Sequence, residues 1–357
     1  MKRVLSILVL LWAVGAPALG QTSDTARARK LENDIRWLVN RHKGRMKAGV
    51  AIVHLASGEK VEVNASEPYP LASVFKLPIM LELARQIQHD ENGLSLSLPL
   101  VVRESERCIG SGRLQDVANG TSVSLERCVE LMETISDNTA TDMIFERIGL
   151  ESVDKLMHAQ GLKSSQIYLT NRQAWLISLA QGSDFRGLSP AEIAAKWKKL
   201  SLSERKKAAA RVAQETRSMT LSRFQQLEDA SRARNTHSED VLVAAAVDNL
   251  MSPRDLARLL VLLRQGKLLD RRWTRYCLDV LSRQKFNTRI PRMLPSVATV
   301  YHKTGTIAGV VNDAGIVEMD PGNDLAIVVL VRDVAAGASG DAETLIAKVA
   351  RMAYDRY

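Results

Sequence analysis

The segment Leu71-Ala72-Ser73-Val74-Phe75-Lys76-Leu77-Pro78-Ile79-Met80 places a serine and a lysine three residues apart at the start of an apolar run. Residues i and i+3 of a helix share one face, so the pattern predicts that the Lys76 amine reaches the Ser73 hydroxyl. The run from Val74 to Ile87 is apolar on nearly every side, which indicates a helix buried in a core. A lysine in a dry pocket shifts toward the neutral amine that activates a serine. Ser73 is therefore a candidate nucleophile and Lys76 its base.

The Ser-x-x-Lys spacing is not specific by itself. It occurs at four other places in the chain, at Ser57, Ser152, Ser203 and Ser282. Each of these is expected to be a solvated surface pair. Two further motifs downstream distinguish Ser73.

The second motif is Ser136-Asp137-Asn138, between two predicted helices. Ser, Asp and Asn favour such breaks because their side chains satisfy free backbone groups at helix ends, so a simple capping turn explains them equally well. In the functional interpretation, Ser136 passes a proton to a leaving group and Asn138 holds a substrate amide. Asp137 then supports the turn from behind.

The third motif is Lys303-Thr304-Gly305-Thr306, at the end of a predicted strand. A strand edge that lines a cleft can bind an acyl-amide backbone by strand addition. Lys303 and Thr304 would receive an anionic substrate group, and Gly305 would let the substrate approach closely. The backbone N–H groups of Ser73 and Thr306 could form an oxyanion hole. A plain strand followed by a turn is the alternative interpretation.

The three motifs, in this order, resemble the pattern of class A β-lactamases and penicillin-binding proteins. Four other segments are similar to that family: Gly49-Val50-Ala51-Ile52-Val53, Gly110-Ser111-Gly112-Arg113-Leu114-Gln115, Ile290-Pro291-Arg292 and Asn312-Asp313-Ala314-Gly315. The resemblance extends from about Leu31 to Ala353. It implies that Ser73 attacks a β-lactam or D-alanyl carbonyl, that Lys76 helps to remove its proton, and that Ser136 and Lys303 protonate the leaving nitrogen. Water then hydrolyses the acyl-enzyme.

The sequence departs from the family at the last step. Class A enzymes position the deacylating water with a Glu and with an Asn four residues later, and no Glu between Gly161 and Asn249 has Asn at that offset. The stretch 167–172 lies near the expected start of that loop and contains no acid. Asp184 is a weak substitute. The sequence therefore supports acylation better than rapid deacylation.

Patterning predicts the fold in outline. A helix is expected from about Ala26 to Arg41, and a hairpin from the runs Ala48–Leu55 and Lys60–Asn64. The region from Leu71 to about Pro295 is almost entirely helical. The end of the chain returns to strands and closes with a helix, at Val297–Lys303, Val310–Glu318, Leu325–Arg332 and about Asp341 to Tyr354.

Two strands at the front and three at the back are too few to stand alone, so they should form one sheet. We expect an α/β (α+β) fold, with an antiparallel five-stranded sheet flanked by terminal helices and an inserted all-α lobe, like that of β-lactamases and DD-peptidases. Residues 21–68 and 296–357 would form the α/β domain and 69–295 the all-α domain. The site belongs in the cleft between them. A basic helical insertion is expected at about 170–248.

The net charge of +9 is concentrated in this insertion, where Pro190 to Asn235 hold 11 Lys or Arg and 5 Asp or Glu. Only Trp197 and Phe224 are aromatic there, so nucleic-acid binding is poorly supported. An anionic envelope surface could attract the insertion, but a solvated helical face is the better interpretation.

The first 20 residues, with a basic head, a short apolar run and small residues before Gln21, predict a cleaved signal peptide and a secreted or periplasmic protein. No later segment is long enough to span a membrane. Cys108 and Cys128 could form a disulfide, and buried free thiols are equally compatible. Residue spacing suggests no metal and no cofactor, and we expect a monomer with a small-molecule substrate.

Three functions are compatible with these motifs. The leading hypothesis is a β-lactamase-type serine hydrolase. A peptidase or amidase acting on D-alanyl peptides of the cell wall uses the same acylation groups, and the missing Glu favours it. The third is a protein that binds β-lactams or peptidoglycan and deacylates slowly, or an interaction protein built on the basic insertion.

Overall fold

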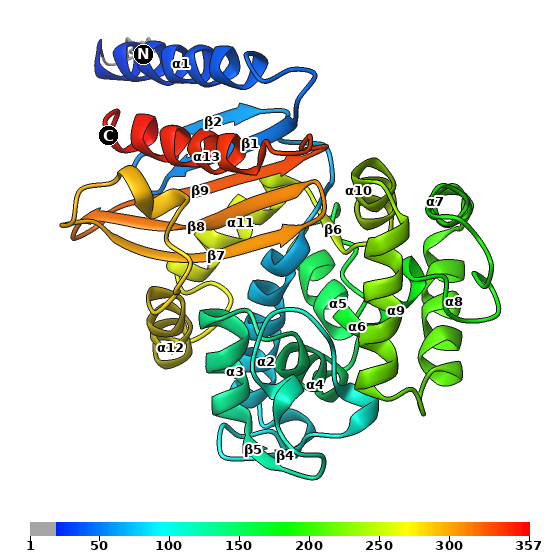
Figure 1. Ribbon diagram of the computed structural model, residues 1–357. Coiled ribbons are helices and arrows are strands. Elements are labelled where there is room, and N and C mark those ends of the chain that lie inside the picture. Colours follow the sequence, from blue (N-terminus) through cyan, green and yellow to red (C-terminus); the bar gives the residue numbers. More distant parts are fainter. Residues whose placement is uncertain (1–18) are drawn as a thin grey trace, which may run out of the picture.

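The computed structural model describes residues 19–357, and a five-stranded antiparallel sheet runs through its upper part (Figure 1). The strand order β2-β1-β9-β8-β7 joins the front and back of the chain, because β1 pairs with β9 along its whole length. This confirms the predicted fold. The strands are β1 (Lys47–His54), β2 (Lys60–Val63), β7 (Thr299–Ile307), β8 (Val310–Asp320) and β9 (Asn323–Arg332).

Strand β7 is longer than the sequence pattern predicts. The pattern places its end at Lys303, yet the pairing with β8 continues through Thr306 opposite Val311. The continuous ladder keeps this segment extended up to the tight turn before β8. The third motif therefore lies within the edge strand of the sheet.

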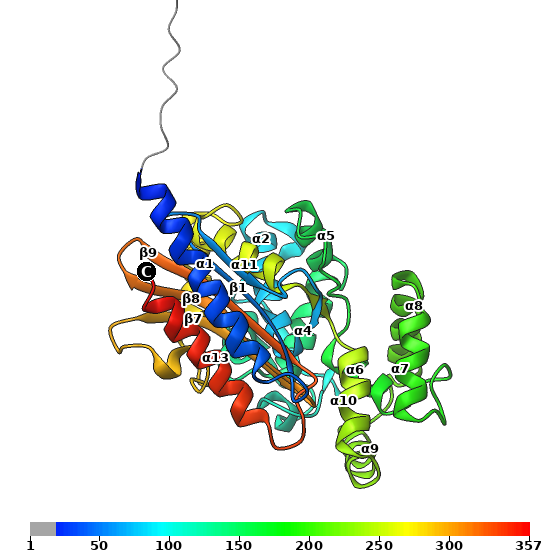
Figure 2. The ribbon, with the colours of Figure 1, turned by 90° about the horizontal axis from the view of Figure 1, so that it is seen from above.

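Two terminal helices cover one face of the sheet, α1 (Leu19–Asn40) and α13 (Ser339–Tyr354) (Figure 2). Apolar residues of both helices, such as Ile35 and Ile346, form one core with the sheet. Helix α1 begins seven residues before the predicted start. The predicted signal peptide, residues 1–20, lies outside the described residues except for its last two, which begin α1.

The other face of the sheet packs on the helical lobe, where α2 (Lys76–Gln88) is central. Helix α2 is buried along most of its length, as its uninterrupted apolar run predicts. The surrounding helices are α3 (Leu125–Thr134), α4 (Asn138–Ile148), α5 (Ser152–Ala159), α11 (Pro253–Arg264) and α12 (Arg271–Ser282). Two short ladders interrupt the predicted all-helical region: β3 (Tyr69–Pro70) with β6 (Leu250–Met251), and β4 (Pro99–Val101) with β5 (Ser122–Ser124).

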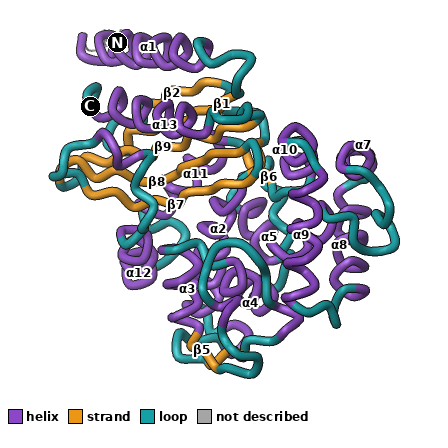
Figure 3. The backbone as a smooth tube through the Cα atoms, in the orientation of Figure 1, coloured by secondary structure: helices purple, strands orange, loops and turns teal. Residues whose placement is uncertain are grey.

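Five helices form the insertion at the side of this lobe (Figure 3). They pack around their own apolar core, in which Phe185, Trp197 and Phe224 are fully buried. Reciprocal Ser–Glu and Thr–Glu bonds start three of the helices, which explains their sharp boundaries. The helices are α6 (Asn171–Ser178), α7 (Pro190–Lys199), α8 (Leu202–Glu215), α9 (Leu221–Arg234) and α10 (His237–Ala246).

The three cysteines are buried free thiols, so the considered Cys108–Cys128 disulfide is not formed. Cys108 belongs to the insertion core and Cys128 to the main core, which separates the two sulfur atoms. Within residues 19–357, no three His, Cys, Asp or Glu side chains are grouped to hold a metal ion. In the same part of the chain, no helix has the length and hydropathy needed to cross a bilayer.

Candidate active site

Ser73 lies in a single 3₁₀ turn, Ala72–Phe75, which leads directly into α2 at Lys76. The sequence predicts one continuous α-helix through Ser73 and Lys76. In the structure, Ser73 lies instead in a 3₁₀ turn and only Lys76 belongs to the α-helix. Ala72 has φ +46°, a conformation that L side chains rarely adopt. Its N–H donates to the carboxylate of Asp248 at 2.7 Å, which holds the strained residue before Ser73 in place.

The Lys76 side chain is fully buried and points toward the second motif, whereas the sequence pattern predicts a contact with the Ser73 hydroxyl; none of its three hydrogen bonds is to Ser73. Its Nζ donates to the Ser136 carbonyl at 2.7 Å, to the Ser136 hydroxyl at 3.1 Å and to the Asn138 side-chain oxygen at 2.8 Å. Burial, and then the nearby positive charge of Lys303, lower the pKa of Lys76 to about 7. A substantial fraction of this amine is therefore neutral at physiological pH.

The second motif forms a tight turn between α3 and α4. Ser136 has φ +61°, and Asp137 caps α4 by accepting from the Ala140 N–H at 2.9 Å. The other carboxylate oxygen of Asp137 accepts from the backbone N–H groups of Arg113 and Leu114 at 2.6 and 2.9 Å. These bonds to Asp137 fix the strained turn to a neighbouring loop.

The third motif brings a second buried lysine to the same hydroxyl. Lys303 Nζ donates to Ser136 Oγ at 3.1 Å and to the Thr304 carbonyl at 3.0 Å. Burial lowers the pKa of Lys303, and the buried Glu133 carboxylate opposes that shift. The Ser136 hydroxyl thus lies between the amines of Lys76 and Lys303. A hydroxyl in this position can accept a proton from one side and donate one on the other.

Gly305 allows β7 to lie directly against the turn that holds Ser73. A Cβ atom at this position would lie 2.6 Å from the Leu71 carbonyl and 3.1 Å from the Ser73 nitrogen. The sequence motif assigns Gly305 to substrate approach, whereas the close approach seen here is between two backbone segments. Asn312 reinforces it, since its Nδ2 donates to the carbonyls of Pro70 and Leu71 at 2.8 and 3.0 Å.

Sequence reasoning missed Arg289, which binds both β7 and β8. Its guanidinium donates to the carbonyls of Gly305 and Asn312 at 2.9 and 2.6 Å, and to Thr306 Oγ1 at 2.6 Å. The arginine side chain is buried, so these bonds are shielded from water. The available signal was its position directly before the family-like segment Ile290-Pro291-Arg292.

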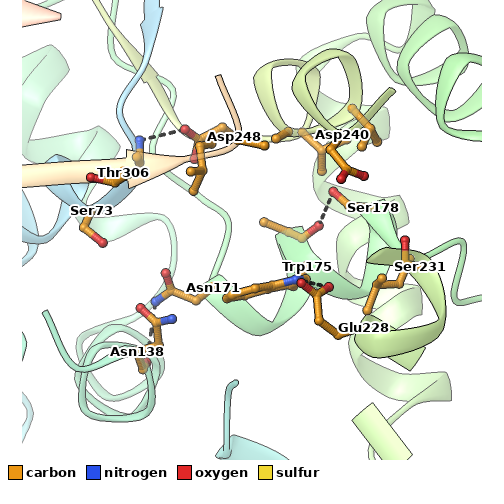
Figure 4. Close-up of a pocket in the computed structure, with 18 of the residues that line it drawn as sticks. Ser73, Asn138, Asn171, Trp175, Ser178, Glu228, Ser231, Asp240, Asp248 and Thr306 are labelled. Atoms are coloured by element: carbon orange, nitrogen blue, oxygen red, sulfur yellow. Dashed lines mark hydrogen bonds between the residues drawn. The ribbon is translucent and has the colours of Figure 1, made fainter. Parts of the chain in front are cut away.

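A cavity of about 560 Å³ opens at the nucleophile (Figure 4). Of the predicted site residues, Ser73, Asn138 and Thr306 line it, and the hydrogen bonds described above join buried Lys76, Ser136 and Lys303 to that surface. The opposite wall comes from the insertion, through Asn171 and Trp175 of α6 and residues of α9 and α10. In this region the sequence pattern pointed only to the stretch 167–172 and Asp184, and it did not indicate that α9 and α10 contribute to the site.

The structure also places the residues considered for the missing Glu. Asp184 forms an ion pair with Arg211 at 2.6 Å within the insertion and is not among the residues lining the cavity, so its suggested role is wrong. Asn171, from the acid-free stretch 167–172, does line the cavity. Its backbone N–H and its side chain both donate to Asp142 at 2.8 Å, which fixes its orientation.

Comparison with known proteins agrees with this fold. A family model described as "Beta-lactamase enzyme family" matches residues 30–357. Extended-spectrum β-lactamase PER-1 of Pseudomonas aeruginosa is 22% identical over 316 residues, which cover 86% of this chain and 81% of PER-1. β-Lactamase VEB-1 of the same species is 23% identical over 173 residues, covering 48% of this chain and only 55% of VEB-1.

Two solved structures illustrate the structural similarity. The penicillin G acyl-enzyme of a PBP-A mutant is 25% identical, with a TM-score of 0.66 and coverage of 92% of this chain and 96% of the other. TLA-1 extended-spectrum β-lactamase is 20% identical, with a TM-score of 0.66 and coverage of 92% and 98%. Fold and site together define a serine hydrolase of the β-lactamase type. The chain belongs to the β-lactamase enzyme family.

Proposed function

We propose that this enzyme opens β-lactam rings through an acyl intermediate on Ser73. The observation that carries the proposal is the Ser136 hydroxyl, 3.1 Å from both Lys76 Nζ and Lys303 Nζ, in a buried network beside the cavity that Ser73 lines. Such a network supplies a base for the attack and a proton for the leaving group.

In the proposed acylation, Ser73 Oγ attacks the lactam carbonyl carbon while the neutral amine of Lys76 receives the hydroxyl proton. The carbon–nitrogen bond of the ring then breaks, and the ring nitrogen takes a proton from Ser136. Lys76 replaces that proton, which returns its amine to the neutral state. Lys303 holds the Ser136 hydroxyl from the other side and adds positive charge where the leaving nitrogen gains electrons.

The same geometry supports the binding roles. The backbone N–H groups of Ser73 and Thr306 form the oxyanion hole, and the contact of β7 with the Ser73 turn at Gly305 holds the two backbone segments together. The carboxamide of Asn138 lines the cavity and binds the acyl-amide of the substrate. Thr304 and Lys303 are assigned to its anionic group on the family motif alone, because both side chains are buried and neither lines the cavity.

For deacylation, we propose that Lys76 acts a second time. Its amine is neutral again after acylation, so it can take a proton from the water that attacks the acyl carbonyl and return that proton to Ser73. The low pKa of Lys76, caused by burial and by Lys303, supports this role. The class A arrangement of Glu with Asn four residues later does not occur between Gly161 and Asn249.

We further propose export, on the signal-like sequence of residues 1–20, and action as a monomer. Fractionation of the expressing cells tests export. Size-exclusion chromatography coupled to light scattering tests whether the protein is a monomer.

Intact-protein mass spectrometry after mixing with benzylpenicillin, followed over time, tests the function. We expect a covalent adduct that forms and then decays, and no adduct in Ser73→Ala. A persistent adduct would indicate a slow-deacylating binding protein rather than a hydrolase. Turnover of a D-alanyl-D-alanine peptide without turnover of any β-lactam would replace the proposal with a peptidase.

A further inference from the structure

The active-site cavity continues from Ser73 into a side chamber that the insertion builds. We call this part the insertion chamber and define it by its lining residues on, or directly after, α6, α9 and α10. Figure 4 shows Ser73 and Thr306 at one side, Asn171 and Trp175 in the middle, and Glu228, Ser231 and Asp240 at the other side. A group bound near Asn138 therefore has open space toward the insertion. The polar insertion chamber residues are Trp175, Ser178, Glu228, Ser231, Arg232, Asn235 and Asp240, and its apolar wall includes Leu179, Val243 and Val247.

Two of the three carboxylates on the cavity wall are already compensated. Glu228 accepts from Trp175 Nε1 at 2.8 Å and from Arg232 Nε at 2.7 Å, so its charge is paired with a guanidinium. Asp248 accepts from the backbone N–H groups of Ala72 and Asn249. Burial raises the pKa of Asp248 to about 7, so it carries only part of a charge at neutral pH.

Asp240 is different. It lies in the first turn of α10 and accepts from the Asn235 side chain at 2.9 Å through one oxygen. Among the ion pairs of residues 19–357, none involves Asp240. A carboxylate in the first turn favours the helix by itself, but Asp240 also faces an apolar cavity that leads to the nucleophile. It leaves the insertion chamber with a net negative charge.

We propose that the insertion chamber receives the acyl side chain of the β-lactam and that Asp240 selects side chains ending in an ammonium group. The aromatic face of Trp175 and the apolar wall contact the methylene chain, and the Asp240 carboxylate pairs with the cation at its end. This inference rests on the proposed function, since it requires acylation at Ser73. The insertion, although basic overall, would then present a negative charge to the cavity and select among substrates.

Three penicillins with acyl chains of similar length and different terminal groups test the inference: heptanoyl, 6-aminohexanoyl and adipoyl amides of 6-aminopenicillanate. They end in a methyl group, an ammonium group and a carboxylate. In the wild-type enzyme we expect kcat/KM to be about fivefold higher for the ammonium compound than for heptanoyl, and lower for adipoyl. Asp240→Asn keeps an oxygen that accepts from Asn235 and removes the charge. In this variant the ratio of kcat/KM for the ammonium compound to kcat/KM for the heptanoyl compound should fall to about one.

Glu239→Gln is the matched control. This neighbouring carboxylate caps α10 through Thr236 and does not line the cavity, and Gln preserves the reciprocal cap. Its ratio should equal that of the wild type. Arg232→Gln removes the cation paired with Glu228 and should raise the ratio.

Each outcome decides the inference. An unchanged ratio in Asp240→Asn, no preference in the wild type, or an equal loss in Glu239→Gln overturns it. Benzylpenicillin separates this result from the proposed function, because Asp240→Asn should still form the Ser73 adduct. If the wild type forms no adduct with any of the four penicillins, the proposed function fails instead.

Discussion

The two walls of the cavity are built in different ways. On the catalytic wall, the Ser73 turn, the turn from Ser136 to Asn138 and β7 come from three distant parts of the sequence, and buried polar bonds join all three. On the insertion wall, helices α6, α9 and α10 are close together in the sequence and pack around an apolar core of their own.

The difference indicates which wall carries the chemistry. Ala72 and Ser136 have positive φ on the catalytic wall and are held by buried polar bonds around the nucleophile and the two lysines, whereas the strained Ala180 of the insertion lies outside the cavity. Exposed basic side chains cover much of the insertion, and its contribution to the cavity is shape and charge. The catalytic wall should therefore control rate, and the insertion wall should control selectivity.

Removing the base on the catalytic wall should have the largest effect. Lys76→Ala should slow acylation by benzylpenicillin about 10³-fold, because no neutral amine remains to accept the Ser73 proton. Quenched-flow mass spectrometry measures this rate. Lys60→Ala removes the lysine of another Ser-x-x-Lys pair, exposed on β2, and should acylate like the wild type. Acylation of Lys76→Ala at the wild-type rate would assign the base elsewhere.

The pH dependence should be the second largest effect. The pKa of Lys76 is lowered to about 7, so its amine is mostly protonated at pH 5 and mostly neutral at pH 8. The acylation rate should therefore rise with pH, by about tenfold per unit below 7, and then level off. Lys303→Gln removes the positive charge that helps to lower the pKa, so the midpoint should move to higher pH. A rate that is flat from pH 5 to 8 contradicts the role of Lys76.

Separating β7 from the Ser73 turn should lower the acylation rate about tenfold to 100-fold. Gly305→Ala places a Cβ 2.6 Å from the Leu71 carbonyl, which forces β7 away from the Ser73 turn. Gly340→Ala is the control, since nothing lies within 4 Å of a Cβ there and its φ is ordinary. Equal kcat/KM values for both variants would show that the contact is not needed for the oxyanion hole.

The smallest effect on rate should come from the insertion core. Ile193→Ala deletes a buried side chain of α7 and should reduce the free energy of unfolding by about 2–4 kcal/mol. Acylation by benzylpenicillin should change by less than about threefold, because Ile193 lies in the insertion core and does not line the cavity. Ile79→Ala makes the same deletion in α2 and should lower both stability and rate. Thermal unfolding together with acylation rates measures this contrast, and an equal loss of rate in both variants would erase the distinction between the walls.

Short-range patterns predicted much of this protein. Periodicity located the terminal helices and all five strands of the sheet, and three motifs located the candidate nucleophile, both lysines and the central serine. These features could be predicted because each depends on a few neighbouring residues. Arg289 could not be found in this way, since its partners lie 16 to 23 positions further along the chain and only the β7–β8 pairing brings them to it.

The sequence by itself determined the fold class and the chemical groups, because burial periodicity and residue type are local properties. The tertiary structure decided which surfaces those groups share. It placed Asp240 and Trp175 across a cavity from Ser73, and it turned Gly305 from a residue for substrate approach into one for backbone contact. The physical reason is that cavities and close backbone contacts arise where separate segments pack together, and no single segment contains the information that fixes that packing.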